Sequence, residues 1–452
     1  MNHDLLNKAL EIQHSDVINL KKNEKDYAFT FIYPPSKVLY PIESSEIEGK
    51  KITEANLYVH IPYCTGRCTY CYFGCYSIAS APITKSVYVE KICSEMKMVT
   101  KYYGRVKLLS IHFGGGTPTT LSEDEINRIF RVIRECFVVG ENIEITFESS
   151  PETLTETKLK CMIANGVNRL NIGIQTLNDT LLQSINRRHN SQKAIDAIKM
   201  AKRIGICNIN VDVMYGLKGQ TIQDWLETLN TVLGLGLQSI STYRLRIHPN
   251  GKLKDELKCF DEEKAIEMYI SMLDVMEKYG FFQCSSHKFA IKEEMAQKQI
   301  VNKRGIGKST LIPIGMAAYG SVDNVVYWNE RTMEKYIERI DANKLPCSIG
   351  YVLNKSEEIA KVCVLGIHNV NGINLEKFQE KFGTNIMSIY GELINKLERC
   401  GLLEINDMYL KPSKLGMVFA DEIATEFYSS TVKEKLGLYS DKYGIFFNNI
   451  LD

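Results

Sequence analysis

The sequence predicts an α/β fold, in which a partial (β/α)6 barrel is followed by a mainly helical, winged-helix-like domain. Three observations support this prediction. Short apolar runs rich in β-branched residues recur along the first half of the chain, helical patterns lie between them, and a compact, mostly helical pattern occupies residues 346–430. Strands that alternate with helices of crossover length form a parallel sheet with the helices outside. The runs lie at residues 57–61, 107–113, 143–147, 169–174, 209–213 and 238–243.

Three of the intervening helices have recognisable starts. Ser122 and Glu125 predict a capping box, and Thr221 opens a second helix. Ser191 is the predicted cap of a third helix, which we expect Gly205 to end. By analogy with complete barrels, the loops at the carboxyl ends of the strands are expected to carry the chemistry.

The pattern divides the chain into four segments. Residues 1–50 are a lead-in, with a solvated turn expected at residues 21–26, and residues 51–290 form the core barrel. Residues 291–345, with a glycine-rich run at 311–320, are a connecting segment. Residues 346–452 form the C-terminal domain, where helices precede a short hairpin. Such a domain is typically a lid or packing module, and no basic recognition helix argues for DNA binding.

Composition favours a cytoplasmic enzyme. The chain has 452 residues and a net charge of +1, which gives no electrostatic case for nucleic acid. The sequence begins Met-Asn-His-Asp without the apolar core of a signal peptide, and no apolar run is long enough to span a membrane. Its 13 cysteines are mostly scattered singly, as in proteins that keep reduced thiols. We therefore expect neither a nucleic acid nor a membrane as a partner.

The most informative motif is a cluster of three cysteines. Cys64, Cys68 and Cys71 have the spacing C-x3-C-x2-C and lie directly after the first predicted strand. Three thiolates on one short loop can hold three irons of a [4Fe–4S] cluster and leave the fourth iron open. A structural zinc site usually takes four ligands, often as two separated pairs, and a disulfide framework is rare in a chain of this kind. We therefore predict that the three cysteines ligate iron.

Several further motifs appear in a fixed order. Together with the cysteines they resemble the oxygen-independent coproporphyrinogen III oxidase (HemN-like) family of radical S-adenosylmethionine (SAM) enzymes, which includes haem chaperones and class C methyltransferases. The resemblance covers residues 50–430 and includes the C-terminal domain. It implies a radical SAM barrel that binds SAM at the open iron and cleaves it reductively to a 5′-deoxyadenosyl radical. The motifs are YVHIP (58–62), HFGGGTPT (112–119), FESSP (147–151), NRLNIGIQ (168–175) and DVMYGL (212–217).

The resemblance assigns roles to individual residues. Glycines at the end of the second strand would let backbone groups approach SAM closely, and Glu148 would bind a ribose hydroxyl or an ammonium group. Tyr58 and Tyr70 would pack beside the cluster or SAM, with core packing an equal alternative for each. The full set of expected contacts to the first SAM is Tyr58, Tyr70, Gly114, Gly115, Gly116, Thr117 and Glu148.

A second SAM molecule is also implied. In the resemblance it is bound by Gln175, Arg187 and Asp212. The guanidinium of Arg187 matches a carboxylate geometrically. Asp212 lies in an apolar strand, where a carboxylate is costly unless it has a partner.

Two departures separate the chain from the oxidase pattern. That pattern has a fourth cysteine two residues after the third, where this chain has Phe73 and then Cys75. Residues 29–42, with the run Tyr33-Pro34-Pro35, are more similar to the class C methyltransferases. The first hypothesis is therefore methylation or cyclopropanation of an sp2 carbon. The alternatives are oxidative decarboxylation of coproporphyrinogen III and a haem chaperone.

The expected partners follow from these three hypotheses. They are an aromatic, unsaturated or tetrapyrrole substrate and a flavodoxin- or ferredoxin-type electron donor. Haem ligation would need a suitable side chain, but the histidines at 189, 248, 287 and 368 are scattered along the chain.

Overall fold

The computed structural model describes residues 2–15, 32–206, 208–247, 253, 260–307 and 309–437. The predicted turn at residues 21–26 and His248 lie outside these ranges, as do residues 29–31 of the Tyr-Pro-Pro segment. Among the described residues, no helix is long and apolar enough to cross a membrane.

Six parallel strands form the barrel wall, in the chain order that the sequence predicts. Neighbours in the sheet are also neighbours in this series, and each pair is parallel. The prediction of a parallel α/β sheet is therefore confirmed. The strands are β2 (Glu54–Ile61), β5 (Lys107–Gly115), β6 (Val138–Ser149), β7 (Arg169–Gln175), β8 (Asn208–Tyr215) and β9 (Ser239–Arg244).

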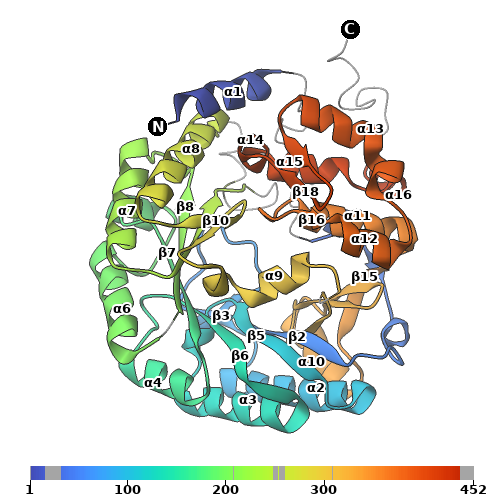
Figure 1. Cartoon of the computed structure of the whole chain (residues 1–452). Helices are drawn as coiled ribbons and strands as arrows, with labels where there is room; N and C mark the ends of the chain where they lie inside the picture. The colour runs from blue at the N-terminus through green and yellow to red at the C-terminus, as the bar shows by residue number, and fades with distance from the viewer. Residues whose placement is uncertain are drawn as a thin grey trace.

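Helices cover the outer face of this wall (Figure 1). They are α2 (Lys85–Tyr103), α3 (Glu123–Cys136), α4 (Glu156–Ala164), α5 (Asp179–Ser184), α6 (Ser191–Ile204), α7 (Ile222–Gly234) and α8 (Glu262–Lys278). The capping box before α3 is present, and Gly205 ends α6 at a φ of 99°. The cap of α6 is Asn190 and not Ser191, because the Asn190 side chain accepts from the Lys193 amide and Ser191 is already helical.

The sheet continues beyond both sides of the barrel wall. On one side β12 (Leu311–Ile314) pairs in parallel with β2, and antiparallel strands follow it. Those strands are β13 (Tyr319–Val322), β14 (Val325–Asn329), β15 (Cys347–Val352) and β1 (Tyr40–Pro41). On the other side β9 pairs with β11 (Lys288–Ala290), which pairs with β10 (Phe282–Ser285). The segment 291–345, expected only to connect two domains, thus supplies strands to a 13-stranded sheet.

The C-terminal unit has a winged-helix-like order of elements. A three-stranded antiparallel sheet, β16-β18-β17, packs with three helices. In chain order these are α11 (Lys355–Gly366), β16 (Ile373–Asn374), α12 (Leu375–Phe382), α13 (Ile386–Arg399), β17 (Leu403–Ile405) and β18 (Tyr409–Pro412). The prediction of helices followed by a hairpin is confirmed. The shorter helices α14 (Lys414–Val418), α15 (Ala420–Glu426) and α16 (Ser430–Lys435) follow.

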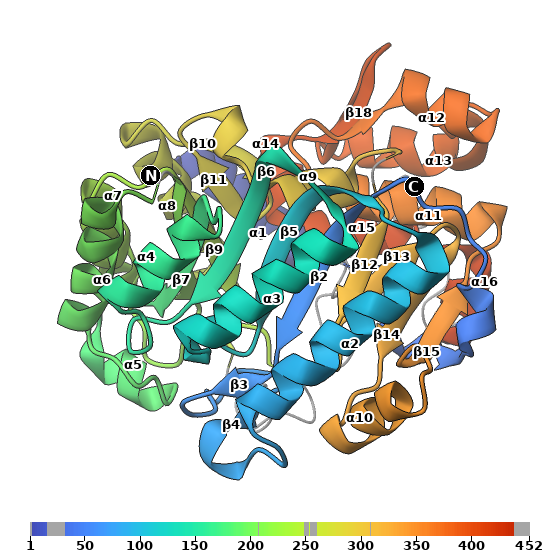
Figure 2. The same cartoon turned by 90° about the horizontal axis from the view of Figure 1, so that it is seen from below.

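The two ends of the barrel carry different elements. The loop between β3 (Tyr63–Cys64) and β4 (Tyr76–Ser77) projects from one end, and α9 (Lys298–Arg304) with the β10–β11 hairpin lies at the other (Figure 2). In the view along the barrel, α9 crosses the middle of the ring of strands (Figure 1). The remaining elements are α1 (His3–His14), α10 (Met333–Asp341) and the 3-10 turns Ser36–Val38, Ser44–Glu46, Ile78–Ser80, Pro118–Thr120 and Glu293–Met295.

Candidate functional site

The cysteine loop lies at the carboxyl end of β2, where the barrel analogy places it. β3 and β4 pair in parallel at its base, and the Tyr76 amide donates to the Pro62 carbonyl over 2.7 Å. The chain therefore leaves and re-enters the barrel at almost one point. All the cysteines from Cys64 to Cys75 are held in this one short excursion.

The thiols of this loop lie in surroundings that favour thiolates. Hydrogen bonding by Cys75 is the main cause that lowers the pKa of Cys64 and of Cys71, the latter to about 7. The same contacts raise the pKa of Cys75 itself. Thr117 Oγ1 donates to Cys64 Sγ over 3.6 Å, and Arg187 Nη1 donates to Cys68 Sγ over 3.5 Å. Because the thiolate is the form that binds metals, this donor set fits iron.

The geometry of the loop also bears on the kind of metal centre. Among the described residues, no group of three His, Cys, Asp or Glu side chains could hold one metal ion between them. In an iron–sulfur cluster each thiolate binds its own iron, so the three sulfurs need not converge on one point. The role of Cys64, Cys68 and Cys71 as ligands stays a prediction that this geometry fits.

The glycine run packs tightly against the protein itself. Gly116 and Thr117 donate their amides over 2.8 Å to Ile61 and Tyr63, beside the cysteine loop. A Cβ on Gly115 would lie 2.6 Å from the His60 ring, and one on Gly114 would lie 3.1 Å from the Glu148 carboxyl carbon. Absent side chains are thus needed for these contacts within the protein. A larger residue at Gly115 would meet His60 first, so loss of SAM binding in such a variant would not by itself show a ligand contact.

Glu148 belongs to a group of buried and half-buried polar side chains. His112 Nε2 lies 2.9 Å from Glu148 Oε1, and Gln297 of the opposite barrel end reaches His112 Nδ1 over 2.6 Å. Tyr58 bonds to His60 Nδ1 over 3.2 Å. Neither histidine was among the expected site residues. Both lie inside the motifs YVHIP and HFGGGTPT, so their position was the signal that could have identified them.

The three residues expected to bind a second SAM lie near one another. Arg187 donates to the Gly173 carbonyl and to Ser150 Oγ, and the amide group of Gln175 also lies beside Gly173. On the neighbouring strand, Asp212 is the sheet partner of Gly173. The structure thus brings Gln175, Arg187 and Asp212 together at the ends of β7 and β8.

The charges of these residues are balanced differently. Burial opposes the charge of Arg187, but Tyr70, Cys68 and Glu152 around it raise its pKa. Burial raises the pKa of Asp212, and Lys288 opposes this shift. Asn210 Nδ2 donates to Asp212 Oδ1 over 2.9 Å. Both charged groups therefore already have partners within the protein.

Known proteins resemble this chain in sequence and in fold. The sequence profile of the radical SAM superfamily matches residues 58–232, and that of the HemN C-terminal domain matches residues 353–419. The heme chaperone HemW of Bacillus subtilis is 29% identical over 372 residues, which cover 81% of this chain and 97% of that protein. An oxygen-independent coproporphyrinogen III oxidase of Helicobacter pylori is 25% identical over 393 residues, covering 82% of this chain and 85% of that protein.

Among solved structures, the coproporphyrinogen III oxidase HemN of Escherichia coli superposes with a TM-score of 0.75 at 20% identity. The match covers 89% of this chain and 97% of HemN, and it confirms the fold. The curated relatives support the two alternative hypotheses, chaperone and oxidase, and give no support to a methyltransferase. Membership of the superfamily implies a [4Fe–4S] cluster and SAM. This chain belongs to the HemN/HemW family of radical SAM proteins.

Proposed function

We propose that this protein binds haem in the manner of a HemW-type chaperone and carries a [4Fe–4S] cluster and SAM at the cysteine loop. The observation that carries the choice is Phe73, which occupies the position of the fourth cysteine in the oxidase pattern. The near-complete coverage of the Bacillus subtilis chaperone supports the same choice.

The surface of the loop suits a flat aromatic ligand. Tyr72 and Phe73 are 42% and 51% exposed, and their rings stack with centroids 4.9 Å apart at 24°. Exposed aromatic rings in contact offer an apolar face on which a macrocycle can stack. They directly follow Cys71, so a ligand bound to them would lie beside the cluster position.

Cationic side chains at the cysteine loop suit the acidic edge of haem. The guanidinium of Arg188 lies against Gly66, and Arg67 contributes to the lowered pKa of Cys71. Both arginines are exposed. Guanidinium groups match carboxylates geometrically, so they would hold the propionates of a stacked haem.

The same loop would hold the redox cofactor. Cys64, Cys68 and Cys71 would bind three irons, and SAM would bind the fourth iron near Glu148 and the glycine run. When bound, the cluster supplies electrons to SAM, and a flavodoxin- or ferredoxin-type protein is the proposed donor. Thr117 and Arg187 would orient the sulfurs through their contacts to Cys64 and Cys68.

Haem titration of the anaerobically reconstituted protein tests the proposal. We expect a Soret band that saturates near one haem per chain. Phe73→Ala should weaken binding by about tenfold, because stacking on an aromatic ring is worth on the order of 1 kcal/mol beyond burial. The matched control is Phe282→Ala, which removes another exposed phenylalanine ring, 40% exposed, at the other end of the barrel. Equal affinity in Phe73→Ala and the wild type would remove the basis for the proposed haem surface.

The second candidate is the oxidase, which the Helicobacter pylori relative favours. It is tested by supplying coproporphyrinogen III, SAM and a reductant and analysing the porphyrins by mass spectrometry. Loss of two propionate carboxyl groups would replace the chaperone proposal with the oxidase. Methyl-deuterated SAM in the same assay examines methyl transfer, because deuterium would then appear in 5′-deoxyadenosine.

A further inference from the structure

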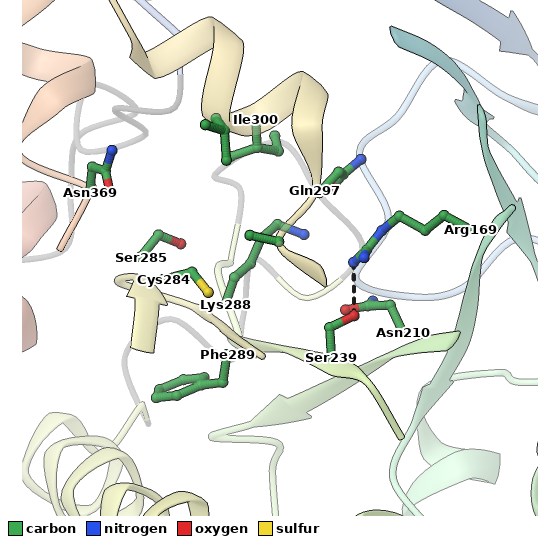
Figure 3. A pocket seen from close by; sticks show the side chains of 12 residues that line it. Arg169, Asn210, Ser239, Cys284, Ser285, Lys288, Phe289, Gln297, Ile300 and Asn369 are labelled. Atoms are coloured by element: carbon green, nitrogen blue, oxygen red, sulfur yellow. Dashed lines mark hydrogen bonds between the residues drawn. The ribbon is translucent and has the colours of Figure 1, made fainter. Parts of the chain in front are cut away.

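A small cavity lies at the amino ends of the barrel strands, away from the cysteine loop. Arg169 begins β7, Ser239 begins β9, and Asn210 lies early in β8, and all three line the cavity. Residues of the β10–β11 hairpin and α9, with Asn369 of the C-terminal unit, also line it (Figure 3). Its volume of about 20 Å³ has room for one or two water-sized groups.

The lining is cationic. Arg169 and Lys288 both line the cavity, and no aspartate or glutamate is among its lining residues. The Cys284 sulfur also points into the cavity (Figure 3). Burial raises the pKa of the Cys284 thiol to about 11, so at neutral pH it adds no negative charge.

Arg169 is the main charged group of this site. It is 1% exposed, and its terminal nitrogens donate to the Met295 carbonyl over 2.7 Å and to Ser239 Oγ over 2.9 Å. Among the described residues its Nε has no hydrogen-bond partner, and no carboxylate lies within ion-pair distance of its guanidinium. A buried charge without such a partner is costly, and the cost calls for an explanation.

A second polar atom of the lining shares this property. Ser285 is 2% exposed, and within the described ranges its hydroxyl finds no hydrogen-bond partner. Glu144 and Asp212 act on Arg169 electrostatically, but neither lines the cavity. A cavity with two cationic side chains and two unsatisfied donors is chemically complementary to an anion.

We propose that this cavity binds a small monoanion of the size of chloride or formate, held by Arg169, Lys288 and Ser285. A small anion matches the cavity volume of about 20 Å³ better than a larger oxyanion such as phosphate does. A cation is disfavoured by the two positive side chains, and a water molecule would satisfy the donors but not the charge.

The position of the site gives the anion a structural role. It would join α9, the β10–β11 hairpin and the barrel, since each contributes lining residues. The cavity is also linked to Asp212 through one residue: Asn210 lines the cavity and donates to Asp212 Oδ1. Lys288 lines the cavity, donates to Ser241 Oγ over 3.0 Å and also acts on Asp212. An anion in the cavity would therefore change the electrostatic potential at Asp212, one of the residues predicted to bind the second SAM.

The test compares thermal unfolding of the anaerobically reconstituted protein in sodium chloride, sodium formate and sodium gluconate at equal ionic strength. Gluconate is too large for the cavity, so it controls for ionic strength. Chloride or formate is expected to raise the Tm by about 2 °C relative to gluconate, because a ligand that binds only the folded state stabilises it. A crystal soaked in bromide should show an anomalous peak within hydrogen-bonding distance of Arg169 Nε.

Two matched variants make the result specific. Lys288→Met should abolish the difference in Tm between chloride and gluconate. Lys298→Met removes an exposed lysine at the start of α9, outside the cavity, and should retain that difference. If Lys288→Met does not fold, Ser285→Ala serves instead, since its hydroxyl makes no bond to a described residue. It should weaken chloride binding about tenfold. Equal Tm in all three salts, or bromide peaks only on the surface, would overturn the proposal.

Discussion

Two arginines at opposite ends of the barrel lie in contrasting surroundings. At the carboxyl end Arg187 donates to Cys68, Ser150 and Gly173, and the groups around it raise its pKa. At the amino end Arg169 has two neutral acceptors, and burial lowers its pKa. Each guanidinium keeps an Nε without a hydrogen-bond partner among the described residues, so the two arginines differ in the direction of their pKa shifts and in the groups that their terminal nitrogens contact. The predicted cofactor site and the proposed anion site thus lie at opposite ends of one barrel (Figure 2).

The largest effect is expected from substitutions of the predicted cluster ligands at the carboxyl end of the barrel. Alanine at Cys64, Cys68 or Cys71 should remove the visible absorption of the cluster and abolish SAM cleavage, because each thiolate is expected to hold one iron. Cys75→Ala is the control, and it should retain iron. Iron content and reductive formation of 5′-deoxyadenosine are the measurements. Full iron in Cys68→Ala would refute the ligand assignment.

Glu95 provides a carboxylate counterpart to Arg169. It is 1% exposed and accepts from Gly315, Asn329 and Tyr336, with no cation in ion-pair distance among the described residues. Burial raises its pKa from 4.5 to about 7. The folded state therefore holds this proton more tightly than the unfolded state. Its contribution to stability is complete below pH 4.5 and is lost as the pH rises to about 7.

The loss should amount to about 3 kcal/mol of unfolding free energy between those two pH values. Glu95→Gln cannot ionise, so its urea-unfolding profile should be flatter over the same range. An identical slope in the variant and the wild type would show that Glu95 is not the titrating group.

The packing of the carboxyl end can be tested with two glycines of positive φ. A Cβ on Gly115, at φ 108°, would clash with the buried His60 ring, whereas Gly383, at φ 68°, has no atom within 4 Å of the added carbon. Gly115→Ala should therefore destabilise the fold by about 2 kcal/mol more than Gly383→Ala. Equal losses in urea unfolding would mean that the space beside Gly115 relaxes freely.

The smallest expected effect is the difference in unfolding free energy between variants of the two arginines. Arg187→Met removes bonds to three groups and should cost about 2 kcal/mol. Arg169→Met also removes two bonds, but it relieves a buried charge that lacks a carboxylate, so in gluconate buffer it should cost about 1 kcal/mol. Urea unfolding in that buffer gives both values. A larger loss for Arg169→Met would contradict the contrast between the two ends.

Much of the barrel was predictable because its signals are local. The six strands appear where runs of β-branched residues lie, and the boxes at Ser122 and Thr221 cap the helices as expected. Ser191 was a wrong cap because Asn190, one residue earlier, is an equally good capping residue. The pairing of β12 with β2 was not predictable, because nothing in residues 311–314 identifies a partner so distant in sequence.

The cysteine loop and the cavity at the other end of the barrel also differ in how far the sequence alone predicts them. Cys64, Cys68 and Cys71 are close in sequence, so their spacing alone predicted a metal centre. The cavity at the other end gathers Arg169, Lys288 and Asn369 from three distant segments, and no motif joins them. Whether a buried arginine meets a carboxylate depends on tertiary packing, which the sequence pattern does not encode.

The pairing of β12 with β2 has a consequence for biosynthesis. β2 leads directly into the cysteine loop, and it gains its second neighbour only when residues 311–314 are available. Until more than half of the chain has left the ribosome, β2 presents an open edge, and such edges are prone to wrong pairing. Iron–sulfur assembly on this chain is therefore expected to follow completion of the sheet. A nascent chain that stops before residue 311 should not acquire a stable cluster.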